Sequence, residues 1–200
     1  MLKTFVREIM DLLLPPRRTD QLVRTLTLEQ LHTLEGEDGL PYHDPRITAL
    51  VWELKYYKTS RAAALAGEYI AEVVLATASE ELGVPLLVPV PMHKNRLRER
   101  GHNQTEVLSR AALPFCAGAV EYRPDVLKRI VNTPTQQGLP KAERVKNVLN
   151  SMVADPKLVE GRACIVLDDV TTTGATLAEA KRALRLAGAR AVHCVALARS

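Results

Sequence analysis

Two adjacent aspartates, Asp168 and Asp169, close the apolar run ACIVL, and the turn TTTGAT follows them at once. The run is typical of a buried strand, and the segment after the turn has helical periodicity that ends at Gly188. A helix N-terminus presents unpaired N–H groups and about half a positive charge, so it favours a bound anion. Adjacent carboxylates can accept hydrogen bonds from a ribose diol or hold a divalent metal. The pattern therefore predicts a site for a sugar phosphate.

The turn itself supplies the expected phosphate contacts. Gly174 lets the backbone approach a phosphate closely, and the threonine hydroxyls add donors. Asp and Thr residues after a strand also serve as helix caps and turn formers, which is the alternative interpretation. The nucleotide-binding patterns GxxxxGKS/T and GxGxxG do not occur in the chain. The residues expected to contact phosphate are Thr171, Thr172, Thr173, Gly174, Ala175 and Thr176.

A basic segment, MHKNRLRERGHNQ, follows the apolar run VPVP. We expect it to form a loop at a strand end, where its cations suit a pyrophosphate. The alternative is a solvated basic face at the start of a helix. Five potential cations fall within eight residues: His93, Lys94, Arg96, Arg98 and Arg100.

A polar stretch over residues 131–147 is marked by glycine and proline and is too long for a rigid element. Polar loops of this kind often close over reacting substrates, although a simple connector is the alternative. Within it, Gln137 is a candidate ligand contact, and Arg144 joins Asp168 and Asp169 as a candidate catalytic group.

The elements that must position these groups alternate between strand and helix, which indicates an α/β fold with a mainly parallel, twisted sheet and flanking helices. Asp44 and Pro45 predict a helix start, with Ile47, Leu50, Val51 and Leu54 on one face. Residues 2–14 have the pattern of an amphipathic helix, and residues 17–44 show no clear element. Further helices are expected over 60–82, 103–113 and 177–188, the last stopped by Gly188, and strands over 85–91, 125–131, near 152, 163–169 and 191–198.

Composition limits the class of protein. Two hundred residues with 46% hydrophobic content fit one compact domain, which we divide into an N-terminal extension, 1–44, and an α/β domain, 45–200. The net charge of +4 and 4% aromatic content give little sign of a nucleic-acid stacking surface. Three cysteines without CxxC spacing favour a reducing cytoplasm. No signal-type segment and no uninterrupted apolar run of membrane-spanning length occurs, so no membrane span is expected.

The string ACIVLDDVTTTGAT resembles the 5-phosphoribosyl-1-pyrophosphate (PRPP) signature of type I phosphoribosyltransferases. Together with PVPMHKNRLRERGHNQ, RIVNTPTQQGLPKAERVKN and the earlier LKYYKTSRAAALAGEYIA, it is similar to the ComF family of competence-associated proteins. The resemblance covers about residues 45–198. It implies a type I phosphoribosyltransferase fold, Mg²⁺-dependent binding of PRPP or of a nucleotide that contains ribose 5-phosphate, and in some bacteria a role in DNA uptake beside a helicase partner. Dimers are common in this fold.

The same resemblance assigns roles to particular residues. It implies that Asp168 and Asp169 meet the ribose hydroxyls and the metal, and that residues 172–176 hold the 5-phosphate. The loop around Lys94 and Arg96, with Arg100, would bind the pyrophosphate. Residues 131–147 would be the mobile catalytic loop.

The chain departs from the family at its N-terminus. Many ComF-type proteins begin with a four-cysteine zinc module, but residues 1–60 contain no cysteine. His32 and His43 without matching partners are expected to be surface or capping residues, so we expect no zinc. In this fold a separate segment selects the nucleophile that accepts the phosphoribosyl group. Because the last expected strand, 191–198, is followed by only two residues, we expect that segment in the N-terminal region.

Three classes of function follow. In an enzyme, metal and basic residues neutralise the departing pyrophosphate while a nitrogen nucleophile attacks C1 of the ribose. The sequence is also compatible with a non-catalytic module that senses PRPP or nucleotides, or that assists DNA uptake. A DNA-binding protein proper ranks last, because the charge is mild and aromatic residues are scarce.

Overall fold

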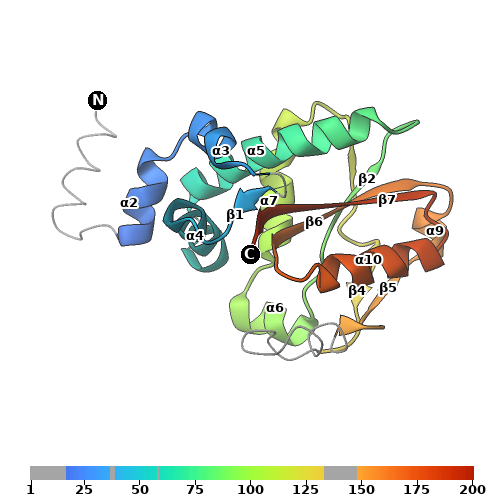
Figure 1. Cartoon of the computed structure of the whole chain (residues 1–200). Coiled ribbons are helices and arrows are strands. Elements are labelled where there is room, and N and C mark those ends of the chain that lie inside the picture. The colour runs from blue at the N-terminus through green and yellow to red at the C-terminus, as the bar shows by residue number, and fades with distance from the viewer. Residues whose placement is uncertain (1–16, 37–38, 58, 133–147) are drawn as a thin grey trace.

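A five-stranded parallel sheet forms the centre of the computed structural model, which describes residues 17–36, 39–57, 59–132 and 148–200. The strand order is β1-β7-β6-β2-β3, so β6 occupies the middle (Figure 1). The mainly parallel sheet with flanking helices confirms the expected fold class. The strands are β1 (Leu40–Pro41), β2 (Leu86–Pro89), β3 (Glu121–Tyr122), β6 (Ala163–Thr171) and β7 (Ala191–Arg199).

Alternate residues of β6 enter two separate cores. Ile165 and Leu167 pack on one face of the sheet, whereas Cys164 and Val166 pack on the other. Successive strand residues point to opposite faces, so a strand that is covered on both sides reads as a continuous apolar run. This explains why ACIVL is apolar throughout.

Different helices cover the two faces. The first core joins the sheet to α4 (Pro45–Trp52), α5 (Ser60–Ser79) and α7 (Gln104–Ala112). The second joins it to α10 (Ala175–Leu186) and to an antiparallel pair, β4 (Leu127–Arg129) and β5 (Met152–Ala154). Shorter helices are α2 (Arg18–Thr25), α3 (Leu28–Leu34), α6 (Lys94–Arg100), α9 (Pro156–Val159), the π-helical turn Glu53–Tyr57 and the 3₁₀ turn Leu113–Phe115.

The start of α4 follows the predicted signals. The Asp44 carboxylate accepts a hydrogen bond from the N–H of Arg46 at 2.8 Å, and Pro45 takes the first helical position. All four residues of the predicted apolar face are buried: Ile47, Leu50, Val51 and Leu54. The expected helices over 60–82 and 103–113 are confirmed as α5, which ends at Ser79, and α7.

The structure differs from the sequence expectations in three places. Residues 17–44 contain α2, α3 and β1, and the capping box between Thr27 and Gln30 was the local signal for α3. The basic segment that was expected to be a loop is the helix α6, so that expectation was wrong. The strand expected over 125–131 is β4, outside the main sheet. The helix expected over 2–14 lies outside the described residues.

Helix α5 packs closely on α7 around Gly67. A Cβ atom at this position would lie 2.6 Å from the backbone carbon of Ala111, far inside ordinary contact distance. In the described part of the chain, α5 alone is long and apolar enough for a membrane span, and half of its most apolar window is buried inside the fold. The apolar residues of α5 thus belong to the core that the helix shares with the sheet, α4 and α7.

We predict that Gly67→Ala lowers the unfolding free energy by about 1–3 kcal/mol, because the added methyl group overpacks the α5–α7 contact. Helix propensity alone predicts the opposite, a gain of about 1 kcal/mol. Chemical denaturation measures the difference, and Ala64→Gly calibrates the propensity effect in the same helix. A Gly67→Ala protein more stable than wild type would contradict the prediction.

Candidate ligand site at the carboxyl end of β6

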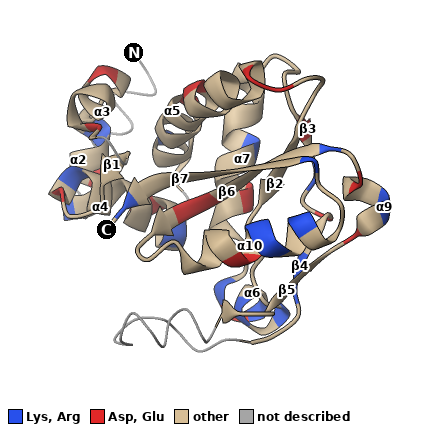
Figure 2. Cartoon of the chain, turned by 45° about the vertical axis from the view of Figure 1, so that its right-hand side comes forward, with Lys and Arg blue, Asp and Glu red and all other residues tan. Residues whose placement is uncertain are grey.

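The two aspartates of the predicted site lie near the carboxyl end of the central strand. Both residues are buried, with 7% of Asp168 and 5% of Asp169 exposed to solvent. By strand alternation, Asp169 lies on the α4–α5–α7 face and Asp168 on the face of α10 and β4. Figure 2 shows this acidic stretch on β6, with the basic helix α6 below it. The carboxylates therefore reach the site from opposite sides of one strand.

Asp168 is the more strongly perturbed carboxyl group. Burial, followed by the negative charge of Asp169, raises the pKa of Asp168 to about 8. Its Oδ1 accepts a hydrogen bond from the N–H of Asp169 at 2.9 Å. Because a buried carboxylate without a cation is costly, Asp168 is expected to gain much from a positively charged ligand.

Arg129 brings positive charge to the same face. Its Nε donates to the carbonyl oxygen of Pro91 at 3.1 Å. Burial lowers the pKa of Arg129, while the charge of Asp168 acts to raise it and that of Arg96 to lower it further. Charges from β6, β4 and α6 thus act on one another at this end of the sheet.

Lys55 reaches Asp169 from the other face. Its Nζ lies 3.1 Å from Oδ2 of Asp169, and its side chain is 21% exposed. Lys55 stands in the π-helical turn Glu53–Tyr57, directly after α4. The sequence analysis did not single out Lys55 as a site residue. The local sequence shows only that a lysine stands between the apolar face of α4 and two tyrosines. Nothing in this pattern indicates that Lys55 contacts β6, which lies more than a hundred residues further along the chain.

The π-helical turn is held by a buried carboxylate. Glu53, which is fully buried, accepts a hydrogen bond from Oγ1 of Thr19 at 2.6 Å and one from Nη2 of Arg17 at 3.3 Å. These contacts tie the segment that precedes and begins α2 to the turn that carries Lys55. The N-terminal helices therefore help to define the candidate site.

The predicted phosphate turn leads directly into α10. Gly174 precedes the helix with φ of +73°, a left-handed conformation that favours glycine. The hydroxyl of Thr173 accepts a hydrogen bond from the N–H of Ala175 at 3.3 Å. Thr171 still belongs to β6, where its carbonyl oxygen accepts a hydrogen bond from the N–H of Ser200. Thr172, Gly174 and Thr176 complete the connection between β6 and the first turn of α10.

None of the residues of helix α6 is buried: Lys94 and Arg98 are exposed, and Arg96 and Arg100 are half-buried. His93 caps it by accepting a hydrogen bond from the N–H of Asn95 at 3.3 Å. Arg100 donates to Oε1 of Gln104 and lies over the ring of Tyr56.

The predicted pyrophosphate residues differ in their relation to the acidic pair. The charge of Arg96 acts on Arg129, which is itself influenced by Asp168, so Arg96 is electrostatically linked to the pair. Arg100 instead contacts Tyr56 and Gln104. Lys94 is exposed at the start of α6. Gln137 and Arg144 lie outside the described residues.

The donor atoms at the acidic pair suit Mg²⁺, which prefers carboxylate oxygens and often completes its shell with water and ligand phosphates. Oδ2 of Asp169 accepts no hydrogen bond in the described part of the chain, although Lys55 lies beside it. No group of three or more His, Cys, Asp and Glu side chains that could hold a metal occurs among the described residues. A metal at Asp168 or Asp169 would therefore complete its coordination with water or with ligand oxygens.

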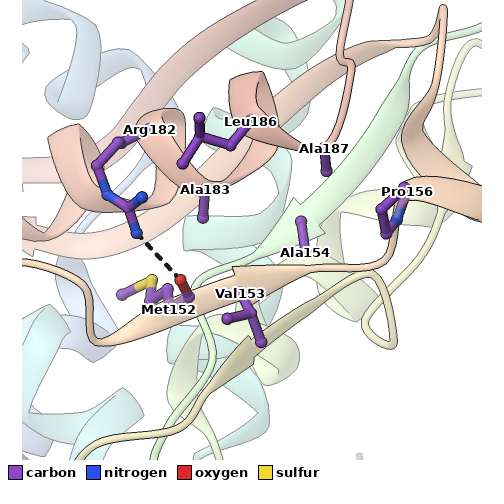
Figure 3. A pocket seen from close by; sticks show the side chains of 8 residues that line it. All are labelled: Met152, Val153, Ala154, Pro156, Arg182, Ala183, Leu186 and Ala187. Carbon is purple, nitrogen blue, oxygen red and sulfur yellow. Dashed lines mark hydrogen bonds between the residues drawn. The ribbon is translucent and has the colours of Figure 1, made fainter.

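A shallow hollow of about 170 Å³ lies elsewhere, between β5 and α10 (Figure 3). Arg182 crosses its edge and donates to the carbonyl oxygen of Met152 at 3.2 Å. Glu179 accepts a hydrogen bond from the N–H of Met152, so the pair fastens β5 to α10. The hollow has a largely apolar lining and contains none of the predicted ligand residues. It is lined by Met152, Val153, Ala154, Pro156, Arg182, Ala183, Leu186 and Ala187.

Comparisons with known proteins agree with this geometry. Residues 105–200 match the phosphoribosyl transferase domain. The chain is 32% identical over 160 residues to DNA utilization protein YhgH of Salmonella typhi, an alignment that covers 79% of this chain and 69% of that protein. It is 31% identical over 128 residues to competence protein F of Haemophilus influenzae, covering 62% and 55%. It is 36% identical over 101 residues to competence protein ComFC of Bacillus subtilis, covering 50% and 38%.

The chain belongs to the ComF family. Its domain match begins in α7 and includes β6, α10 and β7, which carry the type I phosphoribosyltransferase fold of this ComF protein. Lys55 and α6 precede the matched residues. Among solved structures, glutamine PRPP amidotransferase from B. subtilis has a TM-score of 0.45 and 18% identity, over 74% of this chain and 30% of that one.

We predict that Asp168→Asn stabilises the metal-free protein at pH 8 but much less at pH 4. With a folded-state pKa near 8, wild-type Asp168 keeps its proton in the fold while the unfolded chain loses it, so wild-type stability falls as pH rises between about 4 and 8. Asparagine does not titrate and avoids this loss. Thermal unfolding should show a gain at pH 8 of about 1–3 kcal/mol, or several degrees in Tm.

The exposed carboxylate variant Glu160→Gln serves as the control and should show no comparable gain. A Tm difference between Asp168→Asn and wild type that stays constant from pH 4 to pH 8 would contradict the assigned burial effect.

Proposed function

We propose that this ComF protein binds Mg²⁺-PRPP, or a related ribose-5-phosphate nucleotide, at the carboxyl end of β6. The observation that carries the proposal is the buried pair Asp168 and Asp169, followed at once by Gly174 and the N-terminus of α10. The helix N-terminus suits the 5-phosphate, and the carboxylates suit the ribose hydroxyls and the metal. The phosphoribosyl transferase match over residues 105–200 supports the same ligand class.

The reaction that this arrangement suits is phosphoribosyl transfer. A nitrogen nucleophile forms a bond to C1 of the ribose, while the bond from C1 to the pyrophosphate oxygen breaks and the electron pair leaves with pyrophosphate. Mg²⁺, when bound, neutralises charge on the departing group. Asp168 and Asp169 orient the ribose and stabilise positive charge that develops at C1, and Arg96 and Arg129 add positive charge on the pyrophosphate side.

The proposal extends to the segment over 131–147. The family resemblance implies that this segment is the mobile catalytic loop, in which Gln137 would contact the ligand and Arg144 would be a catalytic group. A protein that only senses PRPP would retain the site at β6 but would not need this segment to close. A measurement of pyrophosphate release therefore distinguishes an enzyme from a protein that only senses PRPP. The three free cysteines support a reducing, cytoplasmic setting.

Calorimetric titration tests the ligand. PRPP should bind wild-type protein with Mg²⁺ and much more weakly without it. The double variant Asp168→Asn/Asp169→Asn should lose at least about tenfold in affinity, because charge-assisted contacts to the metal and ribose are removed. Glu160→Gln, an exposed carboxylate change, serves as the matched control. Absence of binding to folded wild-type protein would overturn the proposal.

A second candidate function, direct contact with single-stranded DNA, is favoured by an exposed aromatic cluster around the π-helical turn. Trp52, Tyr56 and Tyr57 are 43%, 53% and 42% exposed. Arg100 lies over the Tyr56 ring, and Arg17 lies 3.4 Å from the centre of the Tyr57 ring. Low aromatic content gave no sign of this cluster, because composition does not show where residues gather. Aromatic rings beside cations suit unstacked bases.

The family names of the relatives support a DNA-uptake role, and a helicase partner remains part of this proposal. Trp52 is the single tryptophan of the chain, so its fluorescence reports on the cluster. Adding oligothymidylate should quench it, more weakly at high salt. Tyr56→Ala should weaken binding about tenfold, whereas Phe115→Ala, at an exposed ring elsewhere, should not. Equal binding by both variants would exclude this cluster as the contact.

A further inference from the structure

Lys55 directly contacts the acidic pair, with its Nζ at 3.1 Å from Oδ2 of Asp169. It comes from the N-terminal side of the chain, on a turn that continues α4 and contacts both α5 and α7. Its position on the sheet face opposite Asp168 is not explained by the phosphate turn or by the basic helix α6. The contact of Lys55 with Asp169 therefore needs a separate functional explanation.

The contact is electrostatic, and within the described residues Asp169 is the only polar partner of the Lys55 ammonium group. Oδ2 of Asp169 accepts no hydrogen bond within the described residues, so the ammonium group of Lys55 lies beside it as a charge partner. A lysine ammonium carries three N–H donors, and largely buried charges are costly unless they are paired and hydrogen-bonded. Such a pair is poorly satisfied by itself. Both partners consequently have capacity to bind further atoms.

A metal ion at Asp169 would compete with this ammonium group. Two cations cannot approach the same carboxylate oxygen without mutual repulsion, which is strong in a partly buried site. A diphosphate ligand has the opposite effect, because its oxygens attract the ammonium group. The arrival of metal and diphosphate together thus favours movement of Lys55 from the carboxylate to the ligand.

We propose that Lys55 is an exchangeable counter-ion of the site: it pairs with Asp169 before ligand binds and donates to the diphosphate oxygens of the Mg²⁺-bound ligand afterwards. The proposal rests on the proposed function and adds a binding residue from outside the phosphoribosyl transferase match. It makes binding of metal and diphosphate mutually supportive, because the ligand relieves the competition between Lys55 and the metal.

The surrounding contacts allow this exchange without loss of the turn. Glu53, rather than Lys55, anchors the turn through Thr19 and Arg17. The long, flexible lysine side chain can then change partners while its backbone stays in place. Trp52 immediately precedes the turn, so its fluorescence gives a second signal of changes near Lys55.

The test compares Lys55→Met with wild type in two separate titrations. For Mn²⁺ alone, followed by electron paramagnetic resonance, we expect affinity to rise several-fold, because the competing ammonium is gone. For PRPP with saturating Mg²⁺, followed by calorimetry, we expect affinity to fall about tenfold to a hundredfold, as for loss of a charge-assisted hydrogen bond. A merely structural role would not shift the two affinities in opposite directions.

Two further variants control for charge and position. Lys55→Arg retains the charge and should keep Mn²⁺ affinity near wild type. Lys128→Met removes an exposed lysine on β4 and should change neither affinity. If Lys55→Met fails to fold by circular dichroism, Lys55→Gln replaces it, since it also removes the charge.

The outcomes separate this proposal from the one it rests on. Wild-type protein that does not bind PRPP would overturn the proposed function. Wild-type protein that binds Mg²⁺-PRPP, together with a Lys55→Met variant whose Mn²⁺ affinity is unchanged or lower, would overturn the counter-ion role alone. Unchanged PRPP affinity in Lys55→Met would also overturn it.

Discussion

The burial of two adjacent carboxylates near the end of β6 is the constraint on which the candidate site depends. Each charge must be compensated, because an isolated carboxylate in a low-dielectric interior is costly. Strand alternation places the compensating charges on opposite faces of the sheet. Lys55 pairs with Asp169 on one face, and its charge also acts to lower the pKa of Asp168. The charge of Arg129 acts on Asp168 from the other face. Compensation at Asp168 is incomplete, as its raised pKa indicates, so the site is suited to receive a metal.

The N-terminal region is joined to this site through several contacts. β1 pairs with β7, and the N–H of Tyr42 donates to the carbonyl oxygen of Arg199. Val23 and Leu31 enter the same core as Ile165. The division at residue 44 stays a prediction about domains, but the packing crosses it. Residues that precede the phosphoribosyl transferase match therefore contribute both to the core and, through the ion pair of Lys55 with Asp169, to the candidate site.

Membership of the ComF family and a type I phosphoribosyltransferase fold constrain function without deciding it, since one fold serves many activities. The acidic pair and the α10 N-terminus suit a phosphorylated sugar, whereas the exposed rings around Tyr56 suit a different class of ligand. Arg100 contacts that aromatic cluster, whereas the charge of Arg96 acts on Arg129, which itself interacts with Asp168.

Local sequence determined the central βαβ unit, because an apolar run, a glycine-led turn and an amphipathic helix each carry their own signals. It also determined the Asp44 cap and the buried face of α4. Tertiary structure alone decided that Lys55 meets Asp169, that β4 leaves the main sheet for β5, and that Trp52 and Tyr56 gather beside Arg100. These contacts join segments distant in sequence, or depend on how a helix is oriented on the sheet. Periodicity records which face of an element is buried, but not which partner covers it.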